Sequence, residues 1–373
     1  MLYRTLVIVL GICPTDLSIY RHSDLRLTQP FHASGHFHVA HHDRRSFVAF
    51  QARCYDAVKF MRIGVDIGGT KVAAGLVDST GAITHKQRVP MISAGSAEAG
   101  FSAVSAAIEA IFSAAPEARP SVTGIGLCSP GPLNPTTGVV INPPNLPCWR
   151  GFPLAAEIER VFGVPARVDN DANAAGLAEV LWGAGQGYAN VFYATLGTGI
   201  GAGIIFDRKI YHGRTGSAAE GGHVTIDYRG PRCACGKFGC IEAFASGPAI
   251  ARLAQAKIAD GASSRIVEIA GGLDEIRAEH VGQAYREGDP LAKEVLDEIA
   301  LLLTVWLGNI VDLLEPDCIV VGGGVAEMMR PFFANISRRL PQWSINQRAV
   351  EIPIVMARYG ADAGIAGAAA LCE

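Results

Sequence analysis

Charged residues are scarce in this sequence, and it has no basic excess. Asp, Glu, Lys and Arg make up 18% of the 373 residues, and the formal net charge is -3 with a pI near 6.4. Proteins that bind the phosphate backbone of nucleic acids usually carry clustered positive charge. We therefore expect no nucleic-acid partner.

No apolar run is long enough to span a bilayer. The longest, "IALLLTVWLGNIV" at 299–311, is shorter than the roughly 20 residues of a transmembrane helix, and it continues an amphipathic pattern that begins near Pro290. We interpret it as a core helix and expect no membrane partner. With 49% apolar residues, a chain of this length can build two domains with sizeable cores.

Residues 1–60 have little glycine and no sustained period. They hold two of the 43 glycines but six of the ten histidines. "LVIVLGIC" weakly resembles a signal peptide, but no A-x-A-type cleavage site follows it. The stretch "HASGHFHVAHH" offers metal ligands without a defined spacing. We predict a poorly ordered N-terminal extension and no export, and we interpret Met61 as a candidate for the true start of translation.

Two common nucleotide-binding motifs, G-x-x-x-x-G-K-[ST] and G-x-G-x-x-G, are missing near the first glycine cluster. There, "MRIGVDIGGTKVAAGLVD" reads as two short apolar strands joined by a Gly-Gly-Thr-Lys turn, which predicts a hairpin. The pattern returns at Leu196, where "LGTGIGAGIIFD" aligns without gaps on "IGGTKVAAGLVD". The repeat predicts duplicated domains that face each other.

The glycine turns suit phosphate binding, because their main-chain N–H groups can converge on an anion while Thr70, Lys71 and Thr198 add donors. A plain tight turn is the alternative for either loop, and the repeat favours phosphate. A third run, "DCIVVGGGVAE" at 317–327, predicts a buried strand, three glycines and a helix. It leaves room for a nucleotide base, although glycine often follows strands in α/β folds.

Polar residues gather where an extended segment meets a helix in "VPARVDNDANAAGLAEVLWG". Asp169, Asn170 and Asp171 lie at this junction, and we expect the helix to start near Ala172. One of the three can cap the helix. A spare carboxylate at such a junction suits a general base for a hydroxyl that attacks a phosphoryl group.

Three of the nine cysteines lie within eight residues, which favours thiolate ligation in a reducing compartment over a disulfide framework. Together with His223 they form H-x9-C-x-C-x4-C, and Gly236 and Gly239 allow the tight turns between them. The spacing predicts a closed, structural zinc site with the ligands His223, Cys233, Cys235 and Cys240. A redox pair or free thiols are the alternatives, although Cys-x-Cys is not the thioredoxin-type Cys-x-x-Cys.

Two acids flank this cluster, Glu220 and Glu242. A rigid metal loop would fix them so that they accept hydrogen bonds from several sugar hydroxyls. Solvent-facing carboxylates are the alternative from spacing alone.

From Met61 onward the chain closely resembles the ROK family, named for repressors, open reading frames and sugar kinases, in the actin-like hexokinase superfamily. The motifs that carry the resemblance are "DIGGTK", "SPGPLNP", "NDAN", "GTGIGAG", "EGGH", "CACGKFGCIE" and "VVGGG". The resemblance implies an α/β fold of two actin-like (ribonuclease H-like) domains around a hinged cleft, with a small zinc-binding loop. We expect a smaller domain at 61–169 plus 360–373 and a larger one at 170–359.

The resemblance also implies ATP-dependent phosphorylation of a hexose at its 6-hydroxyl, with ATP, Mg²⁺ and structural Zn²⁺. Asp171 would be the catalytic base. The sugar would be bound by Asn170, Glu220, His223 and Glu242, with His223 serving both zinc and sugar. The nucleotide and magnesium would be bound by Asp66, Gly68, Gly69, Thr70, Lys71, Gly197, Thr198, Gly199, Gly322, Gly323 and Gly324.

The segments "NLPCW" and "GCIEAFASGPAI" resemble the glucokinases of the family, which favours glucose. Fructose, mannose and N-acetylhexosamine kinases share the motifs, and polyphosphate is an alternative donor. A repressor needs an N-terminal helix-turn-helix, and residues 1–60 show no paired helical pattern. A sugar-binding protein without turnover is a third hypothesis. The cysteine pattern predicts a cytoplasmic protein, and the family likeness implies a homodimer.

Overall fold

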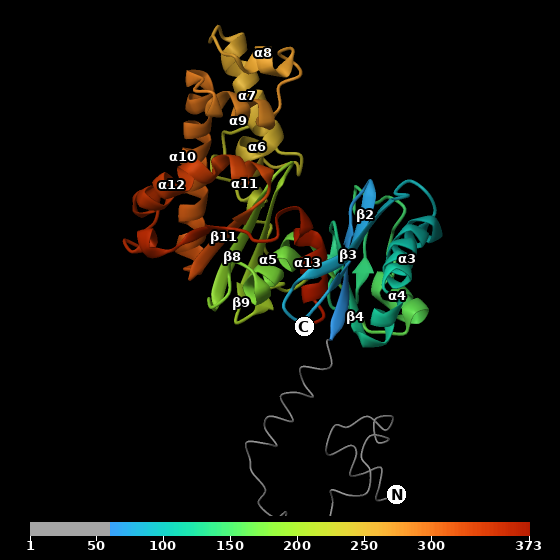
Figure 1. Ribbon diagram of the computed structural model, residues 1–373. Helices are drawn as coiled ribbons and strands as arrows, with labels where there is room; N and C mark the ends of the chain where they lie inside the picture. The colour runs from blue at the N-terminus through green and yellow to red at the C-terminus, as the bar shows by residue number, and fades with distance from the viewer. Residues whose placement is uncertain (1–59) are drawn as a thin grey trace, which may run out of the picture. The chain divides into compact units, whose positions relative to one another are not determined.

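The computed structural model describes residues 60–373 (Figure 1). The predicted N-terminal extension, with its signal-like and histidine-rich stretches, lies outside the described residues.

The first sheet has the strand order β3-β2-β1-β4-β7. Strand β2 is antiparallel to both of its neighbours, β3 and β1, and β4 and β7 run parallel to β1. The helices α3 and α4 contact this sheet, and a short pair, β5 and β6, lies between β4 and α4 in the chain. The bounds are β1 (Met61–Ile67), β2 (Lys71–Val77), β3 (Ile83–Pro90), α3 (Ala97–Ala114), β4 (Val122–Ser129), β5 (Leu133–Asn134), β6 (Val139–Val140), α4 (Leu154–Phe162) and β7 (Ala166–Asn170).

The second sheet repeats this plan in the order β10-β9-β8-β11-β12, with β10, β9 and β8 antiparallel and β11 and β12 parallel to β8. Its hairpin strands start at residues 190 and 200, each 129 positions after the starts of β1 and β2 at 61 and 71. The duplication predicted from the glycine motifs is confirmed. The bounds are β8 (Asn190–Leu196), β9 (Ile200–Phe206), β10 (Lys209–Ile210), β11 (Cys318–Gly322) and β12 (Ile354–Met356).

A helical segment between β10 and β11 covers the second sheet. Its longest helix, α10, begins after the N-cap Asp289, whose Oδ1 accepts the Ala292 N–H at 2.8 Å. Trp306 of α10 is buried against Phe192 of β8, so the predicted core helix is confirmed. The helices of this segment are α6 (Ile241–Ala245), α7 (Gly247–Ala259), α8 (Ile266–Ala270), α9 (Ala278–Arg286) and α10 (Pro290–Leu314). Two further helices, α11 (Gly324–Met329) and α12 (Phe333–Arg339), lie between β11 and β12. The 3-10 turns of the fold are η2 (Pro116–Ser121), η3 (Gly221–His223), η4 (Arg330–Phe332), η5 (Leu340–Gln342), η6 (Ala349–Glu351) and η7 (Gly360–Asp362).

Two helices, α5 (Asp171–Trp182) and α13 (Ala363–Ala370), follow the last strands of the two sheets and pack on each other between them (Figure 1). Helix α13 contacts β1 and β4, and α5 contacts β8 and β9. Strand alternation points Ile63 and Val65 into the core beneath α3, and Gly64 and Asp66 toward α13. The helix pair thereby joins the two sheets.

Glycines allow α13 to lie directly on the first sheet. A Cβ added at Gly64 would lie 1.9 Å from the Ile365 oxygen, and one at Gly126 would lie 1.6 Å from the Ala368 oxygen. Both contacts are with backbone, which a rotamer change cannot relieve. Only glycine fits at these positions unless the helix moves.

Gly64→Ala should therefore destabilise the protein, because the new methyl group must push α13 off β1. We expect a loss of about 1–3 kcal/mol in the free energy of unfolding, measured by urea denaturation. Gly272→Ala is the matched control, since its Cβ would meet nothing closer than Glu275 Cγ at 3.8 Å. Equal stability of the two variants would contradict this view of the interface.

Among the described residues, one helix has the length and apolar composition to cross a membrane. This is α3, with 18 residues and a mean hydropathy of 1.2. Core helices pass the same test, and one such helix is weak evidence for a span. The buried face of α3 contributes Val104, Ile108 and Ile111 to the core of the first sheet, which favours a core helix.

Candidate active site and metal centre

The junction of β7 and α5 settles which polar residue caps the helix. Asn170 is the N-cap, because its Oδ1 accepts the N–H groups of Ala172 at 2.9 Å and Asn173 at 3.4 Å. Helix α5 begins at Asp171, one residue earlier than predicted. Asp171 Oδ1 accepts the Ala172 N–H at 2.8 Å. The cap therefore does not require the Asp171 carboxylate, and no other residue of 60–373 donates a hydrogen bond to its Oδ2.

The environment of Asp171 disfavours its charged form. Solvent reaches the residue, but protein atoms crowd the carboxyl group, and this desolvation is the largest cause that raises its pKa. The hydrogen bond from the Ala172 N–H opposes the shift. The negative charges of Asp66 and Glu220 raise the pKa of Asp171 further. The three predicted site carboxylates therefore lie close enough to interact electrostatically.

Asp66, near the end of β1, rests on the first turn of α13. A Cβ at Gly364 would lie 2.4 Å from Asp66 Cγ. Burial raises the pKa of Asp66, while a hydrogen bond from the Cys128 thiol and then the charges of Lys71 and Arg88 lower it. The hydrogen bond that this carboxylate accepts from Cys128 is weak, with Sγ 3.5 Å from Oδ1. Such a carboxylate is a suitable oxygen ligand for a hard cation such as Mg²⁺.

Cys128 is a site neighbour that the sequence left unassigned. It is fully buried on β4, beside Asp66. Burial first, and then the charges of Asp66 and Asp171, raise the pKa of this thiol well above its usual value. Cys128 is therefore a neutral hydrogen-bond donor and a poor nucleophile.

The two glycine hairpins have similar turns. Gly68 N–H donates to the Lys71 oxygen at 2.9 Å, and Gly197 N–H donates to the Gly199 oxygen at 2.9 Å. A residue outside the hairpin stabilises the second turn, because the Gly247 N–H at the start of α7 donates to the Gly197 oxygen at 2.8 Å. Nothing lies within 4 Å of the Cβ position of Gly197, so this face of the turn is open to a ligand.

A cavity of about 990 Å³ opens next to the second hairpin. It brings together Gly197, Thr198 and Gly324, which the sequence placed in two separate glycine runs. The first hairpin, residues 68–71, does not line it. The residues that the sequence missed come from α7, α9, α11 and the loop before α9, and they are Gly247, Pro248, Ala251, Arg252, Gln255, Ile276, Arg277, Ala278, Glu279, Gly282, Arg286, Val325, Glu327 and Met328.

Of the third glycine run, only Gly324 lines this cavity. Gly323 has φ +94°, and a Cβ there would lie 2.2 Å from the Leu196 oxygen. Gly322 packs near Ala357 and Tyr193. These two glycines act by letting β11 and the second hairpin approach closely.

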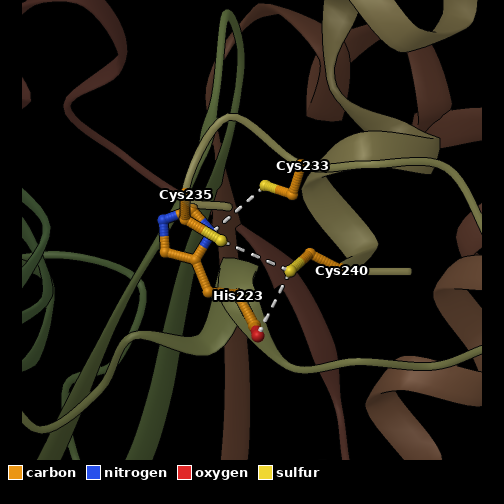
Figure 2. A group of neighbouring side chains, drawn as sticks. All are labelled: His223, Cys233, Cys235 and Cys240. Atoms are coloured by element: carbon orange, nitrogen blue, oxygen red, sulfur yellow. Dashed lines mark hydrogen bonds between the residues drawn. The ribbon is translucent and has the colours of Figure 1, made fainter. Parts of the chain in front are cut away.

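The four predicted metal ligands come together (Figure 2). One ligand atom from each of them lies within 4.8 Å of the others. The Sγ atoms of Cys235 and Cys240 are 3.7 Å apart, and Cys233 Sγ is 3.6 Å from His223 Nδ1. Figure 2 shows the second ring nitrogen of His223 on the side away from the sulfurs, and the His223 side chain is 30% exposed.

These spacings fit zinc. Tetrahedral geometry with ordinary zinc bond lengths places two sulfurs about 3.8 Å apart and a sulfur and a nitrogen about 3.6 Å apart. Burial and the neighbouring thiols raise the pKa of Cys240 to about 12, so a bound cation is what would keep three thiolates this close. The cluster thus matches the donor set and spacing of a structural zinc site.

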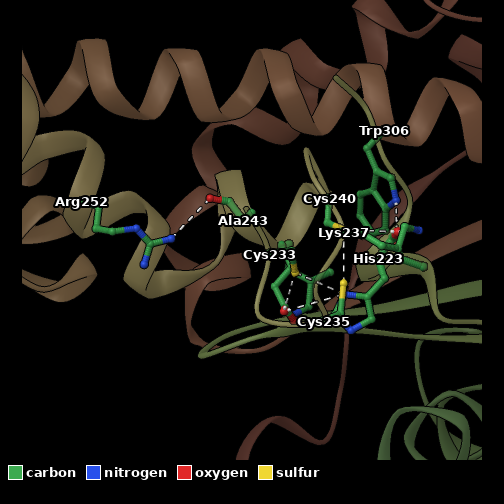
Figure 3. Close-up of polar contacts among 11 residues, drawn as sticks. His223, Cys233, Cys235, Lys237, Cys240, Ala243, Arg252 and Trp306 are labelled. Atoms are coloured by element: carbon green, nitrogen blue, oxygen red, sulfur yellow. Dashed lines mark hydrogen bonds and ion pairs between the residues drawn. The ribbon is translucent and has the colours of Figure 1, made fainter. Parts of the chain in front are cut away.

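Backbone contacts shape the metal loop (Figure 3). Gly239 has φ +67°, and a Cβ there would lie 1.6 Å from the Asp227 oxygen, so only glycine fits. Lys237 Nζ donates to the His223 oxygen at 2.7 Å, and Trp306 Nε1 of α10 donates to the Gly221 oxygen at 3.0 Å. Arg252, which lines the 990 Å³ cavity, donates to the Ala243 oxygen at 3.4 Å. The loop is therefore tied both to the core and to the cavity wall.

The two acids near the metal loop differ in environment. Glu242 Oε2 accepts the Ile200 N–H of the second hairpin at 2.8 Å, and Oε1 lies 3.9 Å from His223 Nδ1. Glu220 is exposed and follows Ala219, whose φ of +65° is unusual for a residue other than glycine. Such strain clusters at functional sites.

His212 is a further neighbour that the sequence did not single out. Its Nε2 lies 2.5 Å from Asp169 Oδ2, and this hydrogen bond raises the pKa of His212. Asp169 Oδ1 also accepts the N–H of Asn170 at 2.7 Å and Nδ2 of Asn173 at 3.1 Å. The Asp169–His212 pair thus braces the strand end next to Asp171.

Comparison with known proteins identifies the family. Residues 62–373 match the family model described as ROK family. The chain belongs to the ROK family. Its fold is accordingly the predicted pair of actin-like α/β domains around a cleft.

Members of the ROK family with several functions are similar to this chain. A glucokinase of Streptomyces coelicolor is 36% identical over 320 residues, 84% of this chain and 98% of the relative. The crystal structure of a ROK family glucokinase from Streptomyces griseus with glucose and AMPPNP has a TM-score of 0.69 at 36% identity, covering 83% of this chain and 98% of that one. A xylose repressor of Caldicellulosiruptor bescii is 29% identical over 287 residues, 77% of this chain and 70% of the repressor.

Proposed function

We propose that this protein is an ATP-dependent hexose kinase that transfers the terminal phosphate to the 6-hydroxyl of glucose. Its similarity to glucokinases along nearly their whole length supports a sugar kinase. The structural observation that supports the proposal is that Asn170 caps α5, which leaves the Asp171 carboxylate available to a ligand. The charges of Asp66, on the predicted phosphate side, and Glu220, on the predicted sugar side, both raise the pKa of this carboxylate, which is consistent with a base that serves both sides.

In this proposal Asp171 is the general base. Its free carboxylate oxygen takes the proton of the sugar hydroxyl as that oxygen attacks the γ-phosphorus in line, and the bond to the β,γ-bridging oxygen breaks to release ADP. Glu242 holds the sugar while its other oxygen stays on the Ile200 N–H. Glu220, the outer nitrogen of His223 and the Asn170 side-chain amide complete the sugar contacts.

The nucleotide is proposed to occupy the 990 Å³ cavity, with its base near α7, α9 and Gly324 and its phosphates at Gly197, Thr198 and Gly199. The first hairpin, with Gly68, Gly69, Thr70 and Lys71, would approach the terminal phosphate from the other sheet. Asp66 would hold Mg²⁺, which supplies neutralising charge to the phosphate oxygens. Closure of the two lobes would exclude water, which otherwise competes as the acceptor.

We further propose zinc in the Cys/His loop, a cytoplasmic homodimer, and domain limits at 61–169 plus 360–373 and 170–359. The contacts of α13 with β1 and β4 support the return of the C-terminal helix to the smaller domain. A reducing compartment would keep the cysteine ligands available for metal.

A sugar-responsive repressor is the second candidate function, favoured by the 29% identity to the xylose repressor. A coupled measurement of ADP release across glucose, fructose, mannose and N-acetylhexosamines separates the candidates. We expect the highest kcat/KM with glucose. A higher kcat/KM with another hexose would make that hexose the acceptor in place of glucose. Binding to operator DNA without turnover of any hexose would support the repressor.

The pH dependence of kcat/KM tests the base. The pKa of Asp171 is raised, so the carboxylate that accepts the proton forms only at a pH above the usual aspartate value of about 3.9. Activity should therefore fall with decreasing pH through an apparent pKa above that value. Initial rates at saturating ATP measure this decrease of kcat/KM at acidic pH, and circular dichroism confirms that the protein stays folded. Undiminished kcat/KM down to pH 4 in the folded protein would refute the assignment.

A further inference from the structure

A second cavity, of about 550 Å³, lies beside the proposed catalytic site. Its wall includes Arg167 and Asp169 from β7, Arg208 from the β9–β10 turn, Lys209 from β10 and His212 from the loop that follows β10. None of the residues proposed to bind sugar, nucleotide or metal lines it. The cavity therefore requires a separate explanation.

The charged groups on this wall leave a surplus of cations. The two side-chain carboxylates are already engaged, Asp169 by His212 at 2.5 Å and Glu373 by Arg62 at 2.9 Å. In contrast, the side chains of Arg167, Arg208 and Lys209 have no hydrogen bond or ion pair within residues 60–373. Three unpaired cations around one cavity favour an anionic ligand.

The rest of the wall is apolar, with Leu177 and Leu181 from α5, Ile210 and Leu371. The cavity volume lies in the range of small-molecule sites, which usually combine an apolar lining with a few polar groups. An inorganic anion would leave the apolar part in water. A small phosphomonoester with a carbon skeleton matches both parts.

The cavity draws its cations from both sheets. Arg167 belongs to β7 of the first sheet, and Arg208 and Lys209 belong to the β9–β10 hairpin of the second. Asp169, on the same wall, accepts the N–H of Asn170, the neighbour of Asp171. A ligand here would contact both sheets and the strand end that carries the proposed base.

We propose that this cavity binds a small organic phosphate through Arg167, Arg208 and Lys209, and that binding changes phosphoryl transfer at Asp171. The ligand stabilises whichever arrangement of the two sheets brings the three cations together. The effect on rate rests on the proposed kinase function. The binding does not, so the two can fail separately.

Calorimetric titration of the full chain with 3-phosphoglycerate tests the site. Saturating glucose and a non-hydrolysable ATP analogue fill the proposed catalytic phosphate sites, so the probe must bind elsewhere. We expect saturable binding that the double variant Arg208→Gln/Lys209→Gln weakens by about tenfold or more. Arg338→Gln, an exposed cation on α12, is the matched control and should bind like the wild type.

Three outcomes would overturn the proposal: no binding to the saturated wild type, equal binding by the double variant at unchanged thermal stability, or equal affinity for inorganic phosphate. Initial rates with and without 3-phosphoglycerate then test the link to catalysis. We expect a shift in KM for glucose in the wild type and none in the double variant. An unchanged KM in the wild type would refute the link while leaving the binding result intact.

Discussion

Asp171→Asn is expected to lower kcat for glucose phosphorylation by about two to four orders of magnitude, the usual contribution of a general base. The amide keeps the size of the side chain and an oxygen that can accept the Ala172 N–H, but it cannot take a proton. KM for glucose should change little, because the other proposed sugar contacts remain. Coupled ADP release measures both constants.

The same substitution should not weaken the fold. A carboxylate whose pKa is raised by folding costs stability at any pH above its unfolded value, because the folded protein disfavours the charged form. At neutral pH the Asn variant should therefore melt at the same temperature as the wild type or higher. Asp274→Asn, at an exposed position, is the control and should keep full activity. An Asp171→Asn protein with wild-type kcat would eliminate Asp171 as the base.

Cys240→Ser is expected to remove zinc and destabilise the protein. Cys240 is fully buried, and its sulfur lies 3.7 Å from that of Cys235. Loss of a metal site is among the changes that cost more than about 4 kcal/mol, and each kcal/mol lowers Tm by roughly 2–4 °C in a domain of this size. We expect Tm to fall by about 10 °C and bound zinc to fall from one per chain to none.

KM for glucose should rise in the same variant, because His223 and Glu242 depend on the loop for their positions. Cys148→Ser is the matched control, since Cys148 is a partly exposed thiol outside the cluster. Metal analysis and thermal unfolding of both variants decide the point. Wild-type protein that contains no zinc, with Cys240→Ser unchanged in Tm, would reject the structural site.

The features that the sequence predicted correctly are formed by residues that lie close together in the chain. The Gly-Gly-Thr-Lys turn and its repeat depend on residues close together in the chain, and both hairpins form with the expected spacing of 129 positions. The same holds for His223 and the three cysteines, whose spacing brings their ligand atoms together. Family membership, predicted from the motifs, is confirmed by the match to residues 62–373.

Features that depend on distant packing could not be predicted. Cys128 reaches Asp66 because β4 pairs with β1, and His212 reaches Asp169 across 43 positions. Gly323 resembles a nucleotide contact in sequence but instead makes room for the Leu196 oxygen. Apart from Gly247 and Pro248, which belong to the segment "GCIEAFASGPAI", the residues of α7 and α9 that line the larger cavity lie in no motif. Their roles arise only when the helices pack beside the second hairpin.

The cap of α5 shows how local competition limits such predictions. Asp169, Asn170 and Asp171 can all cap a helix, and their order alone does not select one. In the structure Asp169 is engaged by His212 and Asn173, and Asn170 takes the cap. The carboxylate next in the chain is thereby left for a ligand.

The central claim is that Asp171, held at the start of α5 between two glycine hairpins, prepares a hexose hydroxyl to receive phosphate from ATP. Phosphorus NMR of the full chain with glucose, ATP and magnesium tests it most directly. We expect the wild type to form equal amounts of ADP and a phosphomonoester on the 6-oxygen of glucose, and the Asp171→Asn variant to form almost none. Folded, zinc-loaded protein that forms no sugar phosphate from any hexose, or an Asn variant that forms it as fast, would contradict the claim.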